Sequence, residues 1–184
     1  MAYLETIDAS DRLDGTPKGL RMRQVPPETG RFLAILAAGA PPGQLLEVGT
    51  SAGYSGLWLS LACRQRDQRL STFEVDAQKV KLARETFRLA NVEDVVLVVQ
   101  GDACQHLAEC ERVAFCFMDA EKDIYQQVYE LVVPNLVPSG YFAADNALKH
   151  RDELEPFIQH ALSDRRVDGL VVPVGKGVLW CRKI

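Results

Sequence analysis

The sequence has no excess of positive charge and no long apolar run. Lysine and arginine together number 21 against 25 acidic residues, which gives a formal net charge of −4. This balance disfavours a protein built to coat nucleic acid or an anionic membrane. No apolar segment approaches a membrane span of about 20 residues, and the first residues have neither a basic flank nor a hydrophobic signal segment. We therefore expect a cytoplasmic protein with no nucleic-acid partner and no membrane partner.

The sequence also lacks paired cysteines. Its five cysteines are odd in number and scattered, and no C-x-x-C pattern occurs. A zinc knot or a thioredoxin-like site is thereby disfavoured. Small buried thiols in a reducing compartment are the simpler interpretation.

No linker, internal repeat or low-complexity tract divides the chain. Its 184 residues, 47% of them apolar, suffice for one core. We expect a single domain over residues 1–184. Residues 1–28, rich in glycine, proline and charge, are expected to form a short arm or lid.

Two periodicities alternate along the chain. Short, often β-branched apolar runs predict strands buried on both faces. Longer amphipathic segments between them predict helices. Strand-then-helix repeats indicate an α/β fold with a parallel sheet and helices on both faces. The expected strands are residues 45–48, 70–75, 95–99, 114–118 and 141–144, and the expected helices are residues 54–63, 77–90, 124–133 and 153–162.

The end of the chain breaks this pattern. Residues 167–174 and 177–181 are two apolar runs separated only by Gly175 and Lys176. Such a short connection requires an antiparallel hairpin. The prediction is a mostly parallel seven-stranded sheet with an antiparallel edge.

A glycine-containing turn follows the first strand, in the sequence L-L-E-V-G-T-S-A-G-Y-S of residues 45–55. Glycine lets the backbone approach a ligand closely at the carboxyl end of a strand, where open α/β sheets bind ligands. The spacing from Glu47 through Gly49 to Gly53 is E-x-G-x-x-x-G rather than G-x-G-x-x-G. A dinucleotide site is therefore disfavoured, although an ordinary turn with no ligand remains open.

Acidic residues end the second and third strands. Glu74, 25 positions after Gly49, is placed to accept the hydroxyls of an adenosyl ribose. Asp76 is expected to cap the following helix. Asp102, in Q-G-D-A, either borders an adenine ring or caps a helix.

The fourth and fifth strands end in Asp119 and in Asp145-Asn146. The carboxyl ends of parallel strands meet at one edge of a sheet, so these side chains should converge. Two carboxylates and an amide oxygen suit Mg²⁺, Ca²⁺ or Mn²⁺. Polar helix caps with no metal are the alternative.

In order and spacing these segments resemble the cation-dependent O-methyltransferase family, which includes catechol and caffeoyl-CoA O-methyltransferases and bacterial relatives. The resemblance is carried by L-L-E-V-G-T-S-A-G-Y-S, F-E-V-D, Q-G-D-A, F-M-D-A-E-K-D-I-Y and A-A-D-N, and it extends from about Lys18 to the end. It implies a Rossmann-like methyltransferase sandwich and S-adenosylmethionine as cofactor. It also implies a small hydroxylated aromatic acceptor and a divalent cation.

The resemblance further implies roles for individual residues. Asp119, Asp145 and Asn146 match the metal ligands, and Lys122 matches the general base, acting beside Asp119. Within the cofactor set, Glu74 would take the ribose and Asp102 and Ala103 would border the adenine. The whole cofactor-binding set is Val25, Glu47, Gly49, Thr50, Ser51, Gly53, Ser55, Glu74, Asp102, Ala103 and Asp119.

The segments that select the acceptor depart from the family. Few residues precede Val25, the loop after Asn146 is short, and Gly175-Lys176-Gly177 replaces a turn that commonly carries Asp-Gly. Lys149 and His150 are acceptor contacts or simply exposed loop residues. Other interpretations stay open: a metal-independent methyltransferase, a non-catalytic binder of S-adenosylmethionine or S-adenosylhomocysteine, and, more distantly, an NAD-dependent dehydrogenase. A homodimer is also possible.

Overall fold

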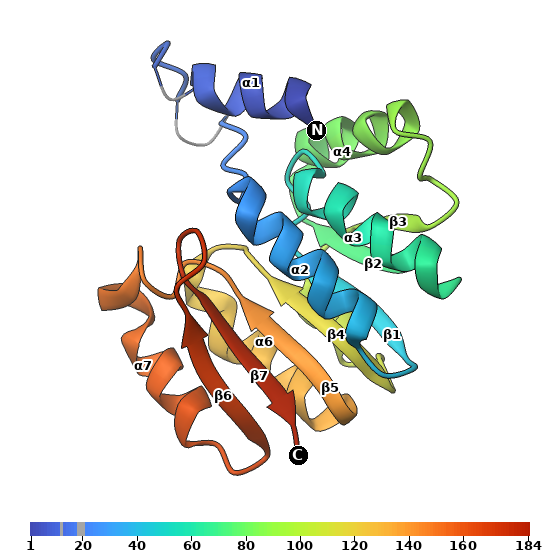
Figure 1. Cartoon of the computed structure of the whole chain (residues 1–184). Helices are drawn as coiled ribbons and strands as arrows, with labels where there is room; N and C mark the ends of the chain where they lie inside the picture. Colours follow the sequence, from blue (N-terminus) through green and yellow to red (C-terminus); the bar gives the residue numbers. More distant parts are fainter. Residues whose placement is uncertain (12, 18–20) are drawn as a thin grey trace.

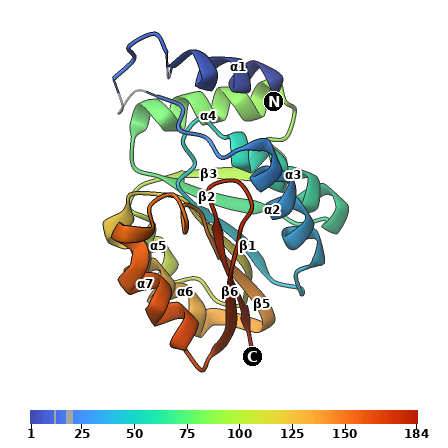
Figure 2. The same ribbon diagram turned by 60° about the vertical axis from the view of Figure 1, so that its left-hand side comes forward.

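The chain folds around one seven-stranded sheet, with strand order β3-β2-β1-β4-β5-β7-β6. This computed structural model describes residues 1–11, 13–17 and 21–184. Figures 1 and 2 show helices on both sides of the sheet, as expected. The strands are β1 (Gln44–Val48), β2 (Leu70–Glu74), β3 (Val96–Gln100), β4 (Val113–Met118), β5 (Leu136–Ala144), β6 (Val167–Val172) and β7 (Val178–Lys183).

Strands β1 to β5 are parallel, and the expected C-terminal hairpin of β6 and β7 is present. The antiparallel strand β7 lies between β5 and β6 rather than at the edge. Because β7 is antiparallel to both neighbours, the edge strand β6 runs in the same direction as β5. The sequence predicted an antiparallel strand at the edge of the sheet, but the antiparallel strand, β7, lies inside it.

Two apolar clusters fill the spaces between the sheet and its helices. On one face, Leu45, Phe115 and Phe117 belong to the cluster that includes residues of α2, α3 and α4. On the other, Leu46 and Cys116 belong to the cluster that includes residues of α5, α6 and α7. This alternation along each strand follows from its two-residue period. The helices are α2 (Pro27–Gly39), α3 (Tyr54–Arg66), α4 (Ala77–Leu89), α5 (Ala103–Leu107), α6 (Tyr125–Val132) and α7 (Arg151–Ser163).

The direction in which successive strands are added reverses between β1 and β4. After β1 the chain adds β2 and β3 to one side, and β4 and β5 then join the other side. Ligands of open α/β sheets bind outside the carboxyl ends of the strands at such a switch point. The topology therefore directs attention to the residues just after Val48 and Met118.

Two N-terminal helices were not predicted from the sequence. Helix α1 (Ala2–Asp11) buries little more than Leu4 and Asp11 and lies beside α4 in both views (Figures 1 and 2). Positions 12 and 18–20 of the expected arm, Lys18 among them, lie outside the described residues.

In the part of the chain that is described, no helix has the length and apolar character that crossing a membrane requires.

Candidate active site

A cavity of about 550 Å³ opens at the carboxyl ends of the central strands. It contains most of the residues expected to hold the cofactor. Its walls come from the ends of β1 and β2, the residues just after β3 and β4, and residues 21–25. The expected residues on its wall are Val25, Gly49, Ser51, Ser55, Glu74, Asp102, Ala103 and Asp119.

The turn after β1, on the wall of this cavity, lies directly against the end of β4. Gly49 has φ +102°, and a Cβ added there would collide with the backbone carbonyl of Asp119. The close approach explains why glycine is needed. The next residues tie the turn to its surroundings, because Ser51 N–H donates to Glu74 Oε2 (2.9 Å) and Ser51 Oγ donates to the carbonyl of Met22 (2.8 Å).

Carboxylates line the adjoining strand ends. Glu74 Oε1 accepts hydrogen bonds from the N–H groups of Val75 (2.9 Å) and Asp76 (3.0 Å). Asp76 caps α4, as predicted, through Gln78 N–H at 2.7 Å. Asp102 caps α5 and also lies on the cavity wall, so its two suggested roles are compatible.

Three residues of the expected cofactor set do not reach the cavity wall: Glu47, Thr50 and Gly53. Glu47 is fully buried, and its Oε2 accepts a hydrogen bond from Thr72 Oγ1 at 2.6 Å. Burial raises the pKa of this carboxyl to about 7, against the opposing effect of the Ser55 and Thr72 hydroxyls. Glu47 therefore lies behind the cavity wall, where its carboxyl group interacts with the hydroxyl of the wall residue Ser55.

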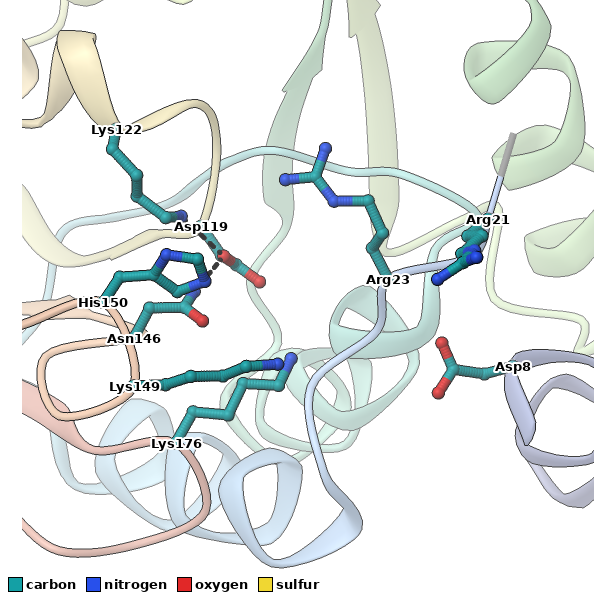
Figure 3. A pocket seen from close by; sticks show the side chains of 9 residues that line it. All are labelled: Asp8, Arg21, Arg23, Asp119, Lys122, Asn146, Lys149, His150 and Lys176. Carbon is teal, nitrogen blue, oxygen red and sulfur yellow. Dashed lines mark hydrogen bonds and ion pairs between the residues drawn. The ribbon is translucent and has the colours of Figure 1, made fainter. Parts of the chain in front are cut away.

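A second, smaller cavity of about 170 Å³ lies beside the first (Figure 3). Asp119 is on the wall of both cavities. Its Oδ1 accepts a hydrogen bond from Asn146 Nδ2 at 2.8 Å and forms an ion pair with Lys122 Nζ at 3.5 Å. The structure thus brings Asn146 to Asp119, as the strand ends predicted, and places Lys122 beside Asp119, as the family resemblance implied.

Asp145 lies next to Asn146 and is fully buried, and neither of its carboxylate oxygens has a hydrogen-bond partner among the described residues. Burial and the neighbouring charge of Asp119 raise its pKa. A buried carboxylate without donors is costly, and a cation removes that cost. The oxygens of Asp119, Asp145 and Asn146 are the donor set that Mg²⁺ or a similar ion prefers, so these residues fit a divalent cation.

Lys122 begins a short 3₁₀ helix (Lys122–Ile124), and its side chain is only 7% exposed. Its Nζ donates to the carbonyl of Ala120 and to the hydroxyl of Tyr125, both at 2.7 Å. Burial lowers the pKa of the ammonium, while the charges of Asp119 and Asp145 oppose the change. Tyr125 was missed from the sequence, although it lies in the quoted segment F-M-D-A-E-K-D-I-Y.

Residues 21–24 were also missed as site residues. Arg21 and Arg23 line both cavities, and Arg23 forms an ion pair with Glu121 at 2.7 Å. The segment is fixed by Asp11, whose carboxylate accepts from Met22 N–H at 2.9 Å. The only sequence signal was the expectation of an arm or lid.

A further acidic group, Glu130, His160 and Asp164, lies away from both cavities. Arg166 forms ion pairs with Glu130 (2.9 Å) and Asp164 (2.6 Å). Since Arg166 pairs with both acids and His160 lies 2.6 Å from Glu130, we interpret the group as an ion-pair network.

Comparison with known proteins agrees with this geometry. A model of the O-methyltransferase family matches residues 12–184. A caffeoyl-CoA O-methyltransferase from Populus kitakamiensis is 28% identical over 98% of this chain and 85% of its own length. A catechol O-methyltransferase from Niastella koreensis is 28% identical over 78% of this chain and 69% of its own.

Among solved structures, the O-methyltransferase from Bacillus cereus in complex with SAH superposes with a TM-score of 0.81 at 23% identity, covering 100% of this chain and 91% of that one. This likeness confirms the Rossmann-like fold. From the family match, with which the cavity at the switch point is consistent, we conclude that this chain is an enzyme of the S-adenosylmethionine-dependent O-methyltransferase family.

Proposed function

We propose that this enzyme transfers a methyl group to a hydroxyl of a small phenolic or catechol-like acceptor, with help from a divalent cation. The observation that carries the proposal is the position of Asp119, on the wall between the two cavities. Methyl transfer is an in-line displacement, so donor and acceptor must meet at a short distance. A cofactor in the larger cavity and an acceptor in the smaller one would meet at this wall.

The larger cavity, of about 550 Å³, would hold S-adenosylmethionine, because its wall offers polar groups along its length. Glu74, Asp102 and Ala103 lie on its wall. The carboxylate of Glu74 would accept from the ribose, and Asp102 and Ala103 would border the adenine. Gly49, Ser51 and Ser55 would surround the methionine part, with Val25 closing the other side. Glu47, Thr50 and Gly53 would act by holding the turn.

Asp119, Asp145 and Asn146 would hold the cation. When bound, such an ion lowers the pKa of a phenolic hydroxyl and fixes its orientation. The chain's own contribution is the placement of these oxygens: Asn146 Nδ2 donates to Asp119 and holds it at the cavity wall. The relatives, a caffeoyl-CoA O-methyltransferase and a catechol O-methyltransferase, support this acceptor class.

Lys122 would accept the proton of the acceptor hydroxyl. It lines the smaller cavity and not the larger one, which places it on the acceptor side. Its hydrogen bonds to Ala120 and Tyr125 fix the position of Nζ beside Asp119. Positioned proton transfer contributes roughly 10²–10⁴-fold to a rate.

Replacement of the proposed base tests this assignment. Lys122→Met should lower kcat for a catechol by roughly 10²-fold or more, because the hydroxyl proton then has no positioned acceptor. Binding of S-adenosylhomocysteine, measured by calorimetry, should change little because Lys122 is not on the cofactor wall. An equal rate in Lys122→Met and the unsubstituted enzyme would contradict the base role.

A screen of catechols, flavonoids and hydroxycinnamoyl thioesters tests the acceptor class. Methylation of at least one class at a hydroxyl is expected, with the product identified by mass spectrometry. Methylation of none of them would contradict the proposed acceptor and leave the cofactor assignment standing.

A further inference from the structure

The smaller cavity is strongly basic. Its wall carries six basic side chains, counting His150, against the two carboxylates of Asp8 and Asp119. Some of these basic groups are already paired, since Arg23 contacts Glu121 and Lys122 contacts Asp119. Arg21 Nε donates to the carbonyl of Thr16, and His150 lies 3.5 Å from Glu153, so Lys149 and Lys176 are the cations considered next.

Lys149 and Lys176 form no ion pair with a carboxylate in the described part of the chain; Lys176 Nζ donates only to the carbonyl of Gln24, at 3.0 Å. In Figure 3 both side chains extend from the same side of the cavity toward its middle, below Asp119 and Asn146. The charge of Lys176 also acts on the buried carboxyl of Asp145, whose pKa it lowers. Lys149 and Lys176 still repel each other in one cavity, and an anion between them relieves that repulsion.

The backbone holds these two lysines together. Lys149 N–H donates to the carbonyl of Lys176 at 3.0 Å, so the loop after Asn146 and the turn before β7 form one hydrogen-bonded unit. The turn is compact: a Cβ added at Gly177, where φ is +85°, would lie 2.6 Å from the backbone nitrogen of Leu148. The fold therefore fixes the backbones of the two lysines side by side, and the hydrogen bond to Gln24 also fixes Lys176 Nζ.

The size of the cavity limits what can lie against the lysines. At about 170 Å³ it is close to the cavity of about 150 Å³ that holds one benzene ring in another protein. A single substituted ring fits, with its hydroxyl at Asp119 and a substituent at the lysines. Larger acceptors would have to extend into solvent.

We propose, building on the proposed function, that the acceptor is a single-ring phenol bearing a carboxylate, which Lys149 and Lys176 bind while Asp119 and Lys122 face the reacting hydroxyl. The lysines set the specificity for an acidic acceptor and orient the ring. They touch the acceptor's anionic end and take no part in the proton transfer.

A matched pair of acceptors isolates this interaction: 3,4-dihydroxybenzoate and the uncharged 3,4-dihydroxybenzamide, which have the same ring and hydroxyls. Their dissociation constants are measured by calorimetry with S-adenosylhomocysteine and Mg²⁺ present. The unsubstituted enzyme should bind the benzoate more tightly. Lys149→Gln and Lys176→Gln should each reduce this preference about fivefold, and the double variant more, as for partly exposed ion pairs.

Lys81→Gln serves as the control, because Lys81 is an exposed lysine of α4 outside both cavities, and this substitution should keep the preference. Rising salt should weaken the preference in the unsubstituted enzyme. Equal binding of benzoate and benzamide, or a preference unchanged in the double variant, would overturn the proposal. The readout is binding and does not depend on methyl transfer. If the preference for benzoate falls in the lysine variants but no acceptor is methylated, the result counts against the proposed function and not against the binding role of the lysines.

Discussion

Glu47→Gln tests the burial of a carboxyl group in the middle of the sheet. Burial raises the pKa of Glu47 from 4.5 to about 7. Each pKa unit is worth about 1.4 kcal/mol, so folding favours the protonated carboxyl over the charged one by roughly 3 kcal/mol. Because the folded-state pKa is the higher one, the group's contribution to stability is fully present below pH 4.5 and is lost as the pH rises through about 7.

A glutamine at position 47 has nearly the same shape as glutamate, but its side chain does not titrate. Its amide oxygen can still accept the hydrogen bond from Thr72 Oγ1. The free energy of unfolding of the unsubstituted protein should therefore fall, relative to Glu47→Gln, by roughly 2 to 3 kcal/mol between pH 5 and pH 8.5. Above pH 8 the variant should be the more stable protein.

Urea unfolding followed by circular dichroism at both pH values measures this difference. The raised pKa of Asp145 acts in both proteins and cancels in the comparison. Glu109→Gln, at an exposed position, is the control and should follow the unsubstituted protein. Parallel pH profiles for Glu47→Gln and the unsubstituted protein would refute the reasoning.

Three further predictions concern the site and the surface network. Gly49→Ala should cost at least about 2 kcal/mol of unfolding free energy and weaken S-adenosylhomocysteine binding in calorimetry, because φ is +102° and the added Cβ meets a backbone carbonyl; unchanged binding would contradict the close approach. Asp164→Asn should cost roughly 1 kcal/mol at pH 7, measured by urea unfolding. Arg166 lowers the Asp164 pKa to about 2, so this cost should vanish as the pH falls from 3.8 through that value. Tyr125→Phe removes the hydroxyl that holds Lys122 Nζ, so kcat should fall about tenfold with little change in cofactor binding; an unchanged kcat would count against that positioning.

The sheet and most of the site could be predicted from the sequence because both depend on strand ends. Apolar runs bounded by glycine and acids locate the parallel strands, and parallel strands bring their carboxyl ends to one edge. Asp119 and Asn146, 27 positions apart, are joined by a hydrogen bond for this reason.

Other features depend on contacts that no local pattern encodes. Glu47 has the alternation of a strand residue, but only the packed sheet shows that its side chain lies behind the cavity wall. Lys176 lies 152 positions from Gln24, to which it donates a hydrogen bond. Helix α2 begins at Pro27 without a side-chain cap, so the usual start signal was missing.

Strand order was partly open for a similar reason. The sequence predicted a two-residue connection at Gly175 and Lys176, whereas the structure joins β6 and β7 through residues 173–177. A short connection of either length makes the two strands a hairpin, but it does not say which of them pairs with β5. The structure pairs Phe142 with Cys181, which places β7 inside the sheet. Cys181 is fully buried there, as an inner strand requires.

The most direct test of the central claim is methyl transfer from labelled S-adenosylmethionine to 3,4-dihydroxybenzoate and catechol, with and without EDTA. We expect a product methylated on oxygen, loss of transfer with EDTA, and recovery when Mg²⁺ is added in excess. Asp145→Asn should not recover to the same rate, because it removes one of the two carboxylates that would hold the cation. Methyl transfer that is undiminished by EDTA in the unsubstituted enzyme would contradict the role given to Asp119, Asp145 and Asn146.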